Sequence, residues 1–230
     1  MSTDAPTCPL EVRGAARFYG PRLIFRNVSH SFPASSVTLL LGANGAGKST
    51  LLRLLAGLSR PAAGEVICRA EASKVAFLGH ETCSYAALTA LENMMFWGRL
   101  YGCGGDEDDA LAVLERVGLG AVAHEKAGTF SRGMAQRLNL ARVLRQRADV
   151  LLLDEPSTGL DMRSVAVLRR EISEARDRGA CVVWISHDAE HDAEIADAAL
   201  VLESRQALAF SDPAEAVEYL RSGGAKGQPC

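Results

Sequence analysis

The segment at residues 42–50, GANGAGKST, is the feature that most constrains the fold of this chain. It fits the pattern GxxxxGK[ST], which indicates a phosphate-binding loop when a strand precedes it and a helix follows it. Both flanks are present, because residues 37–41 form a continuous apolar run and residues 48–58 carry leucines at helical spacing. A glycine-rich turn ahead of a core helix is the alternative interpretation. The two flanks favour a strand, a phosphate-binding loop and a helix, an arrangement typical of α/β proteins.

The residue types within this loop suit a nucleoside triphosphate. Glycines allow the tight turn that brings backbone amides close to the phosphates, and the N-terminus of the helix adds a favourable dipole. We expect Lys48 to neutralise phosphate charge and to act in catalysis, and the Ser49 hydroxyl to ligate Mg²⁺. The residues predicted to bind ATP in this loop are Gly42, Ala43, Asn44, Gly45, Ala46, Gly47, Lys48, Ser49 and Thr50.

A second apolar run, at residues 150–153, ends in the adjacent carboxylates Asp154 and Glu155. We expect Asp154 to hold Mg²⁺ through water, because this ion keeps part of its hydration shell in proteins. Glu155 is then placed to orient, or to accept a proton from, the water that attacks the γ-phosphate. Such a pair at the end of a strand is by itself more often a solvated turn. The phosphate-binding loop makes the catalytic interpretation the stronger one.

His187 follows the next predicted strand, at residues 181–185, and is a further catalytic candidate. An isolated histidine is usually structural. Because His187 comes one strand–helix–strand unit after Glu155, we expect it to reach the γ-phosphate or to polarise the attacking water.

Along the chain, the pattern predicts one α/β domain over residues 1–222, followed by a disordered tail at 223–230. Alternating strands and helices predict a mostly parallel core sheet, with ligands at the carboxyl ends of its strands. Residues 10–18 and 23–32 predict an N-terminal antiparallel layer. Residues 88–146 predict a helical subdomain, in which Thr89 and Glu92 form a capping box at the start of a helix.

Composition excludes several classes of protein. The formal net charge of -3 gives no basic stripe, so nucleic acid is not an expected partner. No apolar run approaches the roughly 20 residues needed to span a bilayer, and the N-terminus does not resemble a secretory signal. The six cysteines have no metal-ligand spacing and are expected to be free thiols: Cys8, Cys68, Cys83, Cys103, Cys181 and Cys230.

Two further segments complete a family pattern. The segment FSRGM at residues 130–134 places Ser131 and Gly133 ahead of a predicted helix, and STGLD occupies residues 157–161. Together with the phosphate-binding loop and the acid pair, they make the chain resemble an ABC transporter nucleotide-binding domain over nearly its whole length. The resemblance implies the ABC ATPase type of P-loop NTPase and hydrolysis of ATP coupled to transport. It also implies an ATP-dependent head-to-tail homodimer, in which Ser131, Gly133 and Asp161 of one copy contact the nucleotide of the other.

Other site residues follow from the same resemblance. Tyr19 is expected to stack on adenine, although a half-buried strand residue is the alternative. Arg132 and Met134 depart from the Ser-Gly-Gly-Gln signature of the family, but the serine and the following glycine remain. His80 stands where most members have a glutamine that touches Mg²⁺, and because imidazole is a poorer Mg²⁺ ligand than oxygen, its role as a metal ligand is doubtful.

The segment that begins at Gly79 normally faces the membrane partner in this family, and it indicates a particular subfamily. Gly79-His80, LTALEN at residues 88–93, and the aromatic residues after it resemble the ATP-binding subunit of the cytochrome c maturation haem exporter. This implies separate integral-membrane permease subunits and a peripheral location on the cytoplasmic face of the inner membrane. An exporter of drugs, lipids or polysaccharide is the first alternative. A soluble ABC protein outside transport, or an ATP-gated clamp without hydrolysis, are the others.

Overall fold

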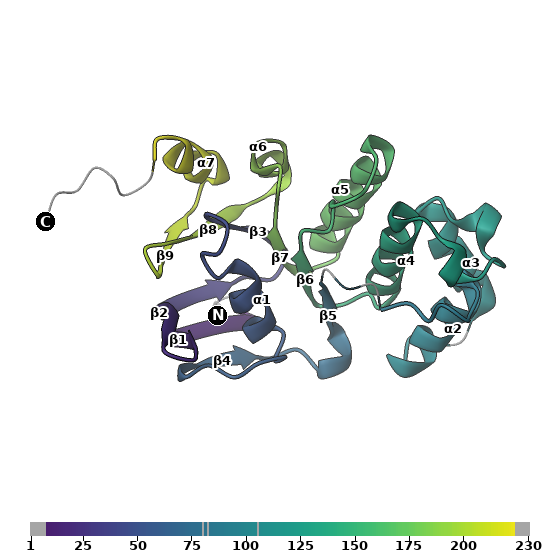
Figure 1. Cartoon of the computed structure of the whole chain (residues 1–230), viewed down its shortest axis with the longest axis horizontal. Helices are drawn as coiled ribbons and strands as arrows, with labels where there is room; N and C mark the ends of the chain where they lie inside the picture. Colours follow the sequence, from purple (N-terminus) through teal and green to yellow (C-terminus); the bar gives the residue numbers. More distant parts are fainter. Residues whose placement is uncertain (1–7, 80, 82, 105, 224–230) are drawn as a thin grey trace, which may run out of the picture.

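Two β-sheets and a helical region form the fold, which the computed structural model describes for residues 8–79, 81, 83–104 and 106–223 (Figure 1). The larger sheet has six strands in the order β5-β6-β7-β3-β8-β9. All neighbouring pairs are parallel except β8 and β9, which are antiparallel. Its strands are β3 (Ser36–Leu41), β5 (Val75–Leu78), β6 (Val150–Asp154), β7 (Cys181–Ile185), β8 (Ala198–Glu203) and β9 (Gln206–Phe210). The predicted parallel core sheet is confirmed.

Alternate residues of this sheet pack into two hydrophobic clusters, one on each face. In β3, for example, Leu40 joins one cluster while Leu39 and Leu41 join the other. Both faces are covered, which explains why the central strands read as continuous apolar runs in the sequence.

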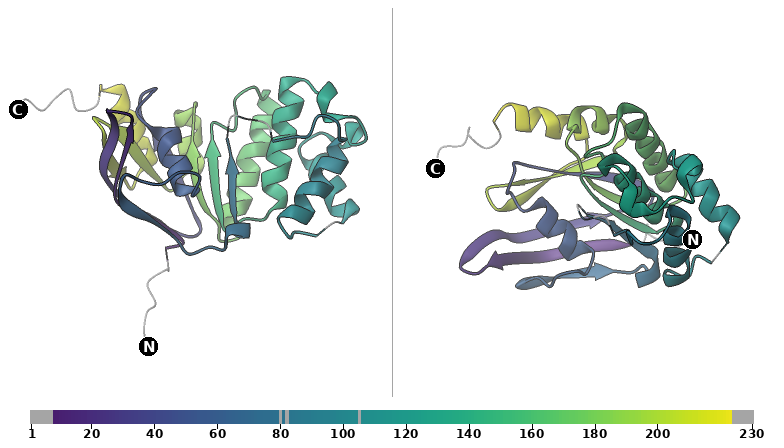
Figure 2. Two further views of the ribbon diagram at one scale, coloured as in Figure 1. Left: turned by 60° about the horizontal axis from the view of Figure 1, so that its bottom comes forward. Right: turned by 45° about the vertical axis from the view of Figure 1, so that its right-hand side comes forward.

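The smaller sheet is the predicted N-terminal antiparallel layer, which is confirmed with the order β2-β1-β4. Its strands are β1 (Leu10–Tyr19), β2 (Arg22–Phe32) and β4 (Ala63–Cys68). Helix α1 (Lys48–Leu55) lies between the two sheets and contacts strands of both, as Figure 2 shows. Its four buried leucines fill the space between them: Leu51, Leu52, Leu54 and Leu55.

Helix α1 ends three residues earlier than the leucine pattern predicts. The chain leaves the helix after Leu55, and Gly57 takes a φ of 71° in the left-handed region. Glycine adopts this conformation without steric cost and commonly ends helices in this way. Leu58 therefore projects from a turn, where it is exposed.

The helical region holds α2 (Ala90–Leu100), α3 (Glu107–Arg116) and α4 (Arg132–Arg145), which gather at one end of the molecule in Figure 1. The predicted capping box is confirmed, because the Glu92 amide donates to Thr89 Oγ1 at 3.0 Å and the Thr89 amide donates to Glu92 Oε2 at 2.7 Å. The acidic start of α3 is capped by Asp106, which accepts from the Asp108 amide at 3.0 Å. Two short 3-10 turns, η2 (Gly120–Val122) and η3 (Ala127–Thr129), connect α3 to α4, and a third, η1 (Ala72–Lys74), lies between β4 and β5.

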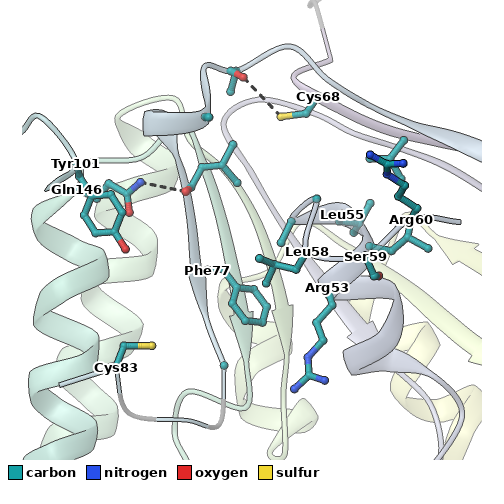
Figure 3. A pocket seen from close by; sticks show the side chains of 18 of the residues that line it. Arg53, Leu55, Leu58, Ser59, Arg60, Cys68, Phe77, Cys83, Tyr101 and Gln146 are labelled. Atoms are coloured by element: carbon teal, nitrogen blue, oxygen red, sulfur yellow. Dashed lines mark hydrogen bonds between the residues drawn. The ribbon is translucent and has the colours of Figure 1, made fainter. Parts of the chain in front are cut away.

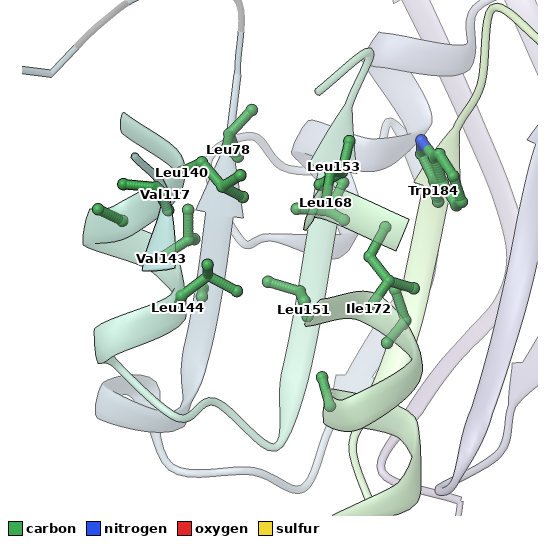
Figure 4. Packing of buried hydrophobic residues seen from close by; sticks show 14 of the residues in the cluster. Leu78, Val117, Leu140, Val143, Leu144, Leu151, Leu153, Leu168, Ile172 and Trp184 are labelled. Carbon is green, nitrogen blue, oxygen red and sulfur yellow. The ribbon is translucent and has the colours of Figure 1, made fainter. Parts of the chain in front are cut away.

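Helices α4 and α5 (Met162–Asp177) cover the face of the core sheet opposite α1. In Figure 4, Leu140 and Val143 of α4 lie beside Leu78, while Leu168 and Ile172 of α5 lie near Trp184. Because each fully buried leucine contributes about 1.5–3 kcal/mol, this packing holds both helices against the sheet. Helix α4 begins directly after Ser131, and α5 directly after Asp161.

Helix α6 (Ala189–Asp192) and the 3-10 turn η4 (Ala193–Ile195) follow β7, and α7 (Pro213–Arg221) follows β9. Over the residues that the structure describes, no helix has both the length and the hydropathy needed to cross a membrane. Apart from Gly223, the predicted tail at 223–230 lies outside the described residues.

Candidate nucleotide-binding and catalytic site

The phosphate-binding loop connects β3 to α1 through three glycines with positive φ. These angles are 136° at Gly42, 79° at Gly45 and 104° at Gly47, which caps the N-terminus of α1. At Gly42, a Cβ atom would lie 2.3 Å from the carbonyl oxygen of Leu202 in β8. The main chain thus passes so close to a neighbouring strand that only glycine fits.

Lys48 lies within this loop. Its Nζ donates to the carbonyl oxygens of Gly42 at 2.7 Å and Ala43 at 3.1 Å. Burial lowers the pKa of Lys48, and the charges of Glu155 and Asp154 oppose that shift. An ammonium carries one more hydrogen than these two carbonyls use, so Lys48 retains a donor for a phosphate oxygen.

Ser49 and Asp154 join the loop to the acid pair. Ser49 Oγ donates to Asp154 Oδ1 at 3.0 Å, and Asp154 is 1% exposed at the end of β6. Hydroxyl and carboxylate oxygens are hard ligands of the kind that Mg²⁺ prefers. The two side chains therefore fit a site in which protein supplies part of the coordination and phosphate and water supply the rest.

Glu155 lies next to His187. The imidazole Nε2 is 2.7 Å from Glu155 Oε2, and the Glu155 amide donates to the carbonyl oxygen of Ile185 at 3.1 Å. Glu155 has a φ of 53°, an unusual value for a residue with a side chain. Its position is thus fixed by β7 as well as by its own strand. The structure brings two of the predicted catalytic residues, Glu155 and His187, into direct contact.

Ser131 and Asp161 each cap a helix. Ser131 Oγ accepts from the Met134 amide at 3.3 Å, and Asp161 Oδ1 accepts from the Ser164 amide at 2.8 Å. The hydrogen bond from the Ser164 backbone lowers the pKa of Asp161. The two segments are neighbours, because a Cβ at Gly133 would lie 3.2 Å from the carbonyl oxygen of Gly159.

A family model described as ABC transporter matches residues 25–158, a range that includes the phosphate-binding loop and the acid pair. The chain belongs to the ABC transporter family. The predicted family resemblance is therefore confirmed at the level of an ATP-binding ABC subunit, and with it the ATPase domain.

Several relatives of this ABC subunit are similar over most of its length. It is 32% identical to the linearmycin resistance ATP-binding protein LnrL of Bacillus subtilis over 212 residues, which cover 87% of this chain and 68% of that protein. It is 37% identical to the cytochrome c biogenesis ATP-binding export protein CcmA of Nitrosococcus oceani over 189 residues, covering 78% and 86%. It is 31% identical to the Nod factor export ATP-binding protein I of Burkholderia lata over 224 residues, covering 93% and 74%.

A solved structure of an ATP-binding subunit of an ABC transporter has the same fold. It superposes with a TM-score of 0.80 and covers 95% of both chains, with 21% sequence identity. At this identity the similarity concerns the fold alone. It confirms the predicted fold class of this ABC subunit.

For two predicted site residues of the ABC subunit, Tyr19 and His80, the predicted contacts remain untested. Tyr19 is the last residue of β1, opposite Arg22 of β2; it is 51% exposed, and the Arg17 guanidinium lies 5.5 Å from its ring centroid. Its stacking on adenine stays a prediction. His80 lies outside the described residues, so its relation to Mg²⁺ also stays a prediction.

A pocket of 610 Å³ borders the phosphate-binding loop of the ABC subunit. It is lined by loop residues 42–46, the start of β2, the turn between β8 and β9, and Leu220 and Gly223 at the end of α7. No pattern in the sequence indicates that these distant segments meet. In the β8–β9 turn, Ser204 and Arg205 both have positive φ.

Sequence reasoning also missed two polar groupings. One includes the residues on either side of His187 and consists of Arg169, Ser186, Asp188 and Asp192. The other places Arg53, Arg60 and Arg142 along a groove between α1, β5 and α4. Ser186 and Asp188 flank His187 in the sequence and were a usable signal, whereas arginines on helices usually mark a solvated face.

Proposed function

We propose that this chain hydrolyses ATP at the junction of the phosphate-binding loop and the acid pair, and that a membrane transporter uses the energy. The contact of Ser49 Oγ with Asp154 Oδ1 at 3.0 Å carries this proposal, because it joins two motifs separated by 105 residues. The fold that creates this junction is the one shared with solved ABC subunits.

Each residue has a distinct task in this reaction. The amides of the loop and Lys48 hold the phosphates, while Ser49 and Asp154 would hold Mg²⁺, which neutralises charge on the phosphate oxygens. Glu155 orients the attacking water and accepts its proton as the bond to the γ-phosphorus forms. The bond from the γ-phosphorus to the β–γ bridging oxygen breaks, which gives ADP and inorganic phosphate. His187 holds Glu155 in place and faces the γ-phosphate.

A second copy of the chain completes the site in this proposal. Ser131 and Gly133 stand at the N-terminus of α4, where the amides not used by the cap and the helix dipole favour an anion, and Asp161 caps the neighbouring helix α5. The γ-phosphate held by one copy would be such an anion for the other. Loss of the γ-phosphate removes the contact that the second copy makes, so hydrolysis reopens the dimer.

A groove of 810 Å³ between α1, β5 and α4 suits the binding of a permease. Figure 3 shows Phe77 on one side of this groove and Leu55 and Leu58 on the other. Arg53 and Arg60 are exposed and form its basic rim, whereas Arg142 is buried in its wall; Glu81 is the acidic residue among the described lining residues. An apolar floor with a basic rim fits an amphipathic segment that carries carboxylates. We place the chain on the cytoplasmic face of the inner membrane, held there by this contact.

The cargo that we propose belongs to c-type cytochrome biogenesis: export of haem, or release of a haem chaperone. This rests on the likeness of residues 79–102 to that family of exporters and on several relatives named CcmA at 35–37% identity. The alternative is an exporter of another class, such as drugs, lipids or polysaccharide. The linearmycin resistance and Nod factor export relatives, at 32% and 31% identity, favour that alternative to a similar degree.

The Glu155→Gln variant tests the reaction. We expect it to bind ATP as the wild type does, to lose turnover, and to elute as an ATP-dependent dimer in size-exclusion chromatography with light scattering. Undiminished hydrolysis would show that the base is another group. Wild-type chain tagged and recovered from membranes should bring its permease with it. Recovery of a permease unrelated to haem handling would refute the cytochrome assignment and leave the ATPase assignment intact.

A further inference from the structure

Asp192 is a buried carboxylate, bonded to the residues that flank His187, that the proposed mechanism does not use. It is 1% exposed at the end of α6, a helix of four residues. Its Oδ1 accepts from Arg169 Nε at 2.7 Å, and its Oδ2 accepts a short hydrogen bond from the Ser186 hydroxyl. Burying a carboxylate is costly unless it is paired and hydrogen-bonded, and here both oxygens have partners.

The partners of Asp192 are the residues on either side of His187. Ser186 Oγ, while donating to Asp192, accepts from the Asp188 amide at 2.9 Å. The Asp192 amide donates to the Asp188 carbonyl oxygen at 3.0 Å. Residues 186 and 188 are therefore both tied to Asp192, and the main chain of the residue between them has little freedom.

Arg169 of α5 extends this network to the packed core. Besides Asp192, it reaches Asp188 Oδ2 at 3.3 Å. Neighbouring turns of α5 carry Leu168 and Ile172, which are buried against the core sheet. Arg169 thus anchors the segment after β7 to a helix that is itself fixed by packing.

The other end of His187 is fixed by the acid pair. Its Nε2 lies 2.7 Å from Glu155 Oε2, and the Glu155 amide bonds the Ile185 carbonyl oxygen at 3.1 Å. The imidazole is 56% exposed, so packing alone does not hold it. Its direction follows from the main chain at residues 186–188.

We propose that Asp192, through Ser186 and together with Arg169, is a positioning residue that directs His187 onto Glu155. This rests on the proposed function, in which that contact serves hydrolysis. Burial raises the pKa of Asp192, and its bonds to Ser186 and Arg169 oppose the shift, as expected for a carboxylate held by those two groups. Asp192 is buried and is distinct from the residues that we propose bind the nucleotide.

The test compares Asp192→Asn and Ser186→Ala with the wild type. Asparagine keeps the shape of Asp192 but places an NH₂ group against either Arg169 or Ser186. Ser186→Ala removes one hydroxyl and leaves the Arg169–Asp192 pair, so it carries the test if Asp192→Asn folds poorly. The control is Glu194→Gln, which changes an exposed carboxylate two residues away.

Two readouts are needed. We expect both variants to lower kcat by about tenfold while KM for ATP stays within about twofold, because the phosphate-binding residues are unchanged and only orientation is lost. In proton–carbon NMR spectra, the Cε1–H signal of His187, assigned with His187→Ala, should shift or broaden in both variants. It should stay in place in Glu194→Gln.

An unmoved His187 signal in both folded variants overturns the positioning role, whatever the kinetics show. A moved signal with unchanged kcat overturns its importance for hydrolysis. Neither result depends on Glu155 being the base. That assignment fails separately, if Glu155→Gln hydrolyses ATP at the wild-type rate.

Discussion

Nε2 of His187 lies 2.7 Å from Oε2 of Glu155, although 32 positions separate them in the sequence. They meet because β6 and β7 are parallel neighbours, with Asp154 paired to Ile185 at their carboxyl ends. Parallel strands deliver their last residues to one edge of a sheet, which is where ligands bind in open α/β folds.

His187→Ala should lower kcat by about a hundredfold, the usual scale for losing a group that acts in proton transfer or orientation. ATP affinity should change little, since Lys48 and the loop amides remain. A fluorescent ATP analogue measures the affinity, and phosphate release measures kcat. His124→Ala, an exposed histidine on the far helical region, is the matched control. A wild-type kcat in His187→Ala would remove this residue from the mechanism.

Lys48→Ala should weaken nucleotide binding itself. Hydrogen bonds to charged groups contribute about 1.5–3 kcal/mol, so we expect a loss of affinity of about tenfold to a hundredfold. Calorimetric titration with ATP and Mg²⁺ measures it. Lys126→Ala removes an exposed lysine outside the site and should bind as the wild type does. Equal affinity in Lys48→Ala and wild type would exclude the phosphate contact.

Gly42→Ala should destabilise the fold by more than about 3 kcal/mol, because a Cβ atom there meets backbone 2.3 Å away and either β8 or the loop must shift. Gly57→Ala is the matched control. It also has positive φ, at 71°, but no atom lies within 4 Å of the added Cβ. Its cost should be about 1–2 kcal/mol from the backbone alone. Urea unfolding measures both, and equal losses would contradict the steric argument.

The buried thiol of Cys181 should make the free energy of unfolding fall at alkaline pH. Burial raises the pKa of its thiol from 9.0 to about 12, so above pH 9 the folded state keeps a proton that the unfolded state loses. The stabilisation is full below pH 9 and declines as pH rises toward 12. Between about pH 8 and about pH 10.5, wild type should lose about 2 kcal/mol more than Cys181→Ala. Urea unfolding at each pH gives the free energy of unfolding. Cys68→Ala, at an exposed thiol, should show the same dependence of this free energy on pH as the wild type. The same pH dependence in all three proteins would refute the shift.

The groove predicts an effect of charge on the permease. Arg53→Glu and Arg60→Glu should each weaken recovery of the permease by about tenfold while ATP binding is kept, because like charges would face the partner. Arg178→Glu, at an exposed arginine beyond α5, should recover it normally. Increased recovery with Arg53→Glu would mean that the docking segment is basic, and unchanged recovery would place it elsewhere.

Much of the fold follows from local patterns in the sequence. The strand before Gly42, the capping box at Thr89 and the acid pair after residues 150–153 depend on neighbours within a few residues. Such patterns determine element type well, and the capping box is present in the structure. The one clear boundary difference, at the end of α1, arose because Leu58 continues the apolar spacing after Gly57 has turned the chain.

The site was less predictable, because its contacts depend on how distant elements pack. The place of His187 after a predicted strand indicated a catalytic role, but no sequence pattern predicts its distance from Glu155. The pairing of Asp192 with Arg169 spans 23 residues and two helices, so no local spacing indicates it. Arg142 looks like a surface residue on α4, yet it donates to the Phe77 carbonyl oxygen at 2.9 Å and lies over the Trp97 ring.

Helix α4 has the signature serine at one end and the groove arginine near the other. Over its 14 residues the helix is about 21 Å long, and it is fastened to β5 by Arg142 and by Gln146, which donates to the Val75 carbonyl oxygen at 3.0 Å. A stiff rod held in this way transmits tilt without bending. If a permease segment and the nucleotide of a second copy bind as proposed, each would act on one end of the same rigid body, and a change at one contact would move the other.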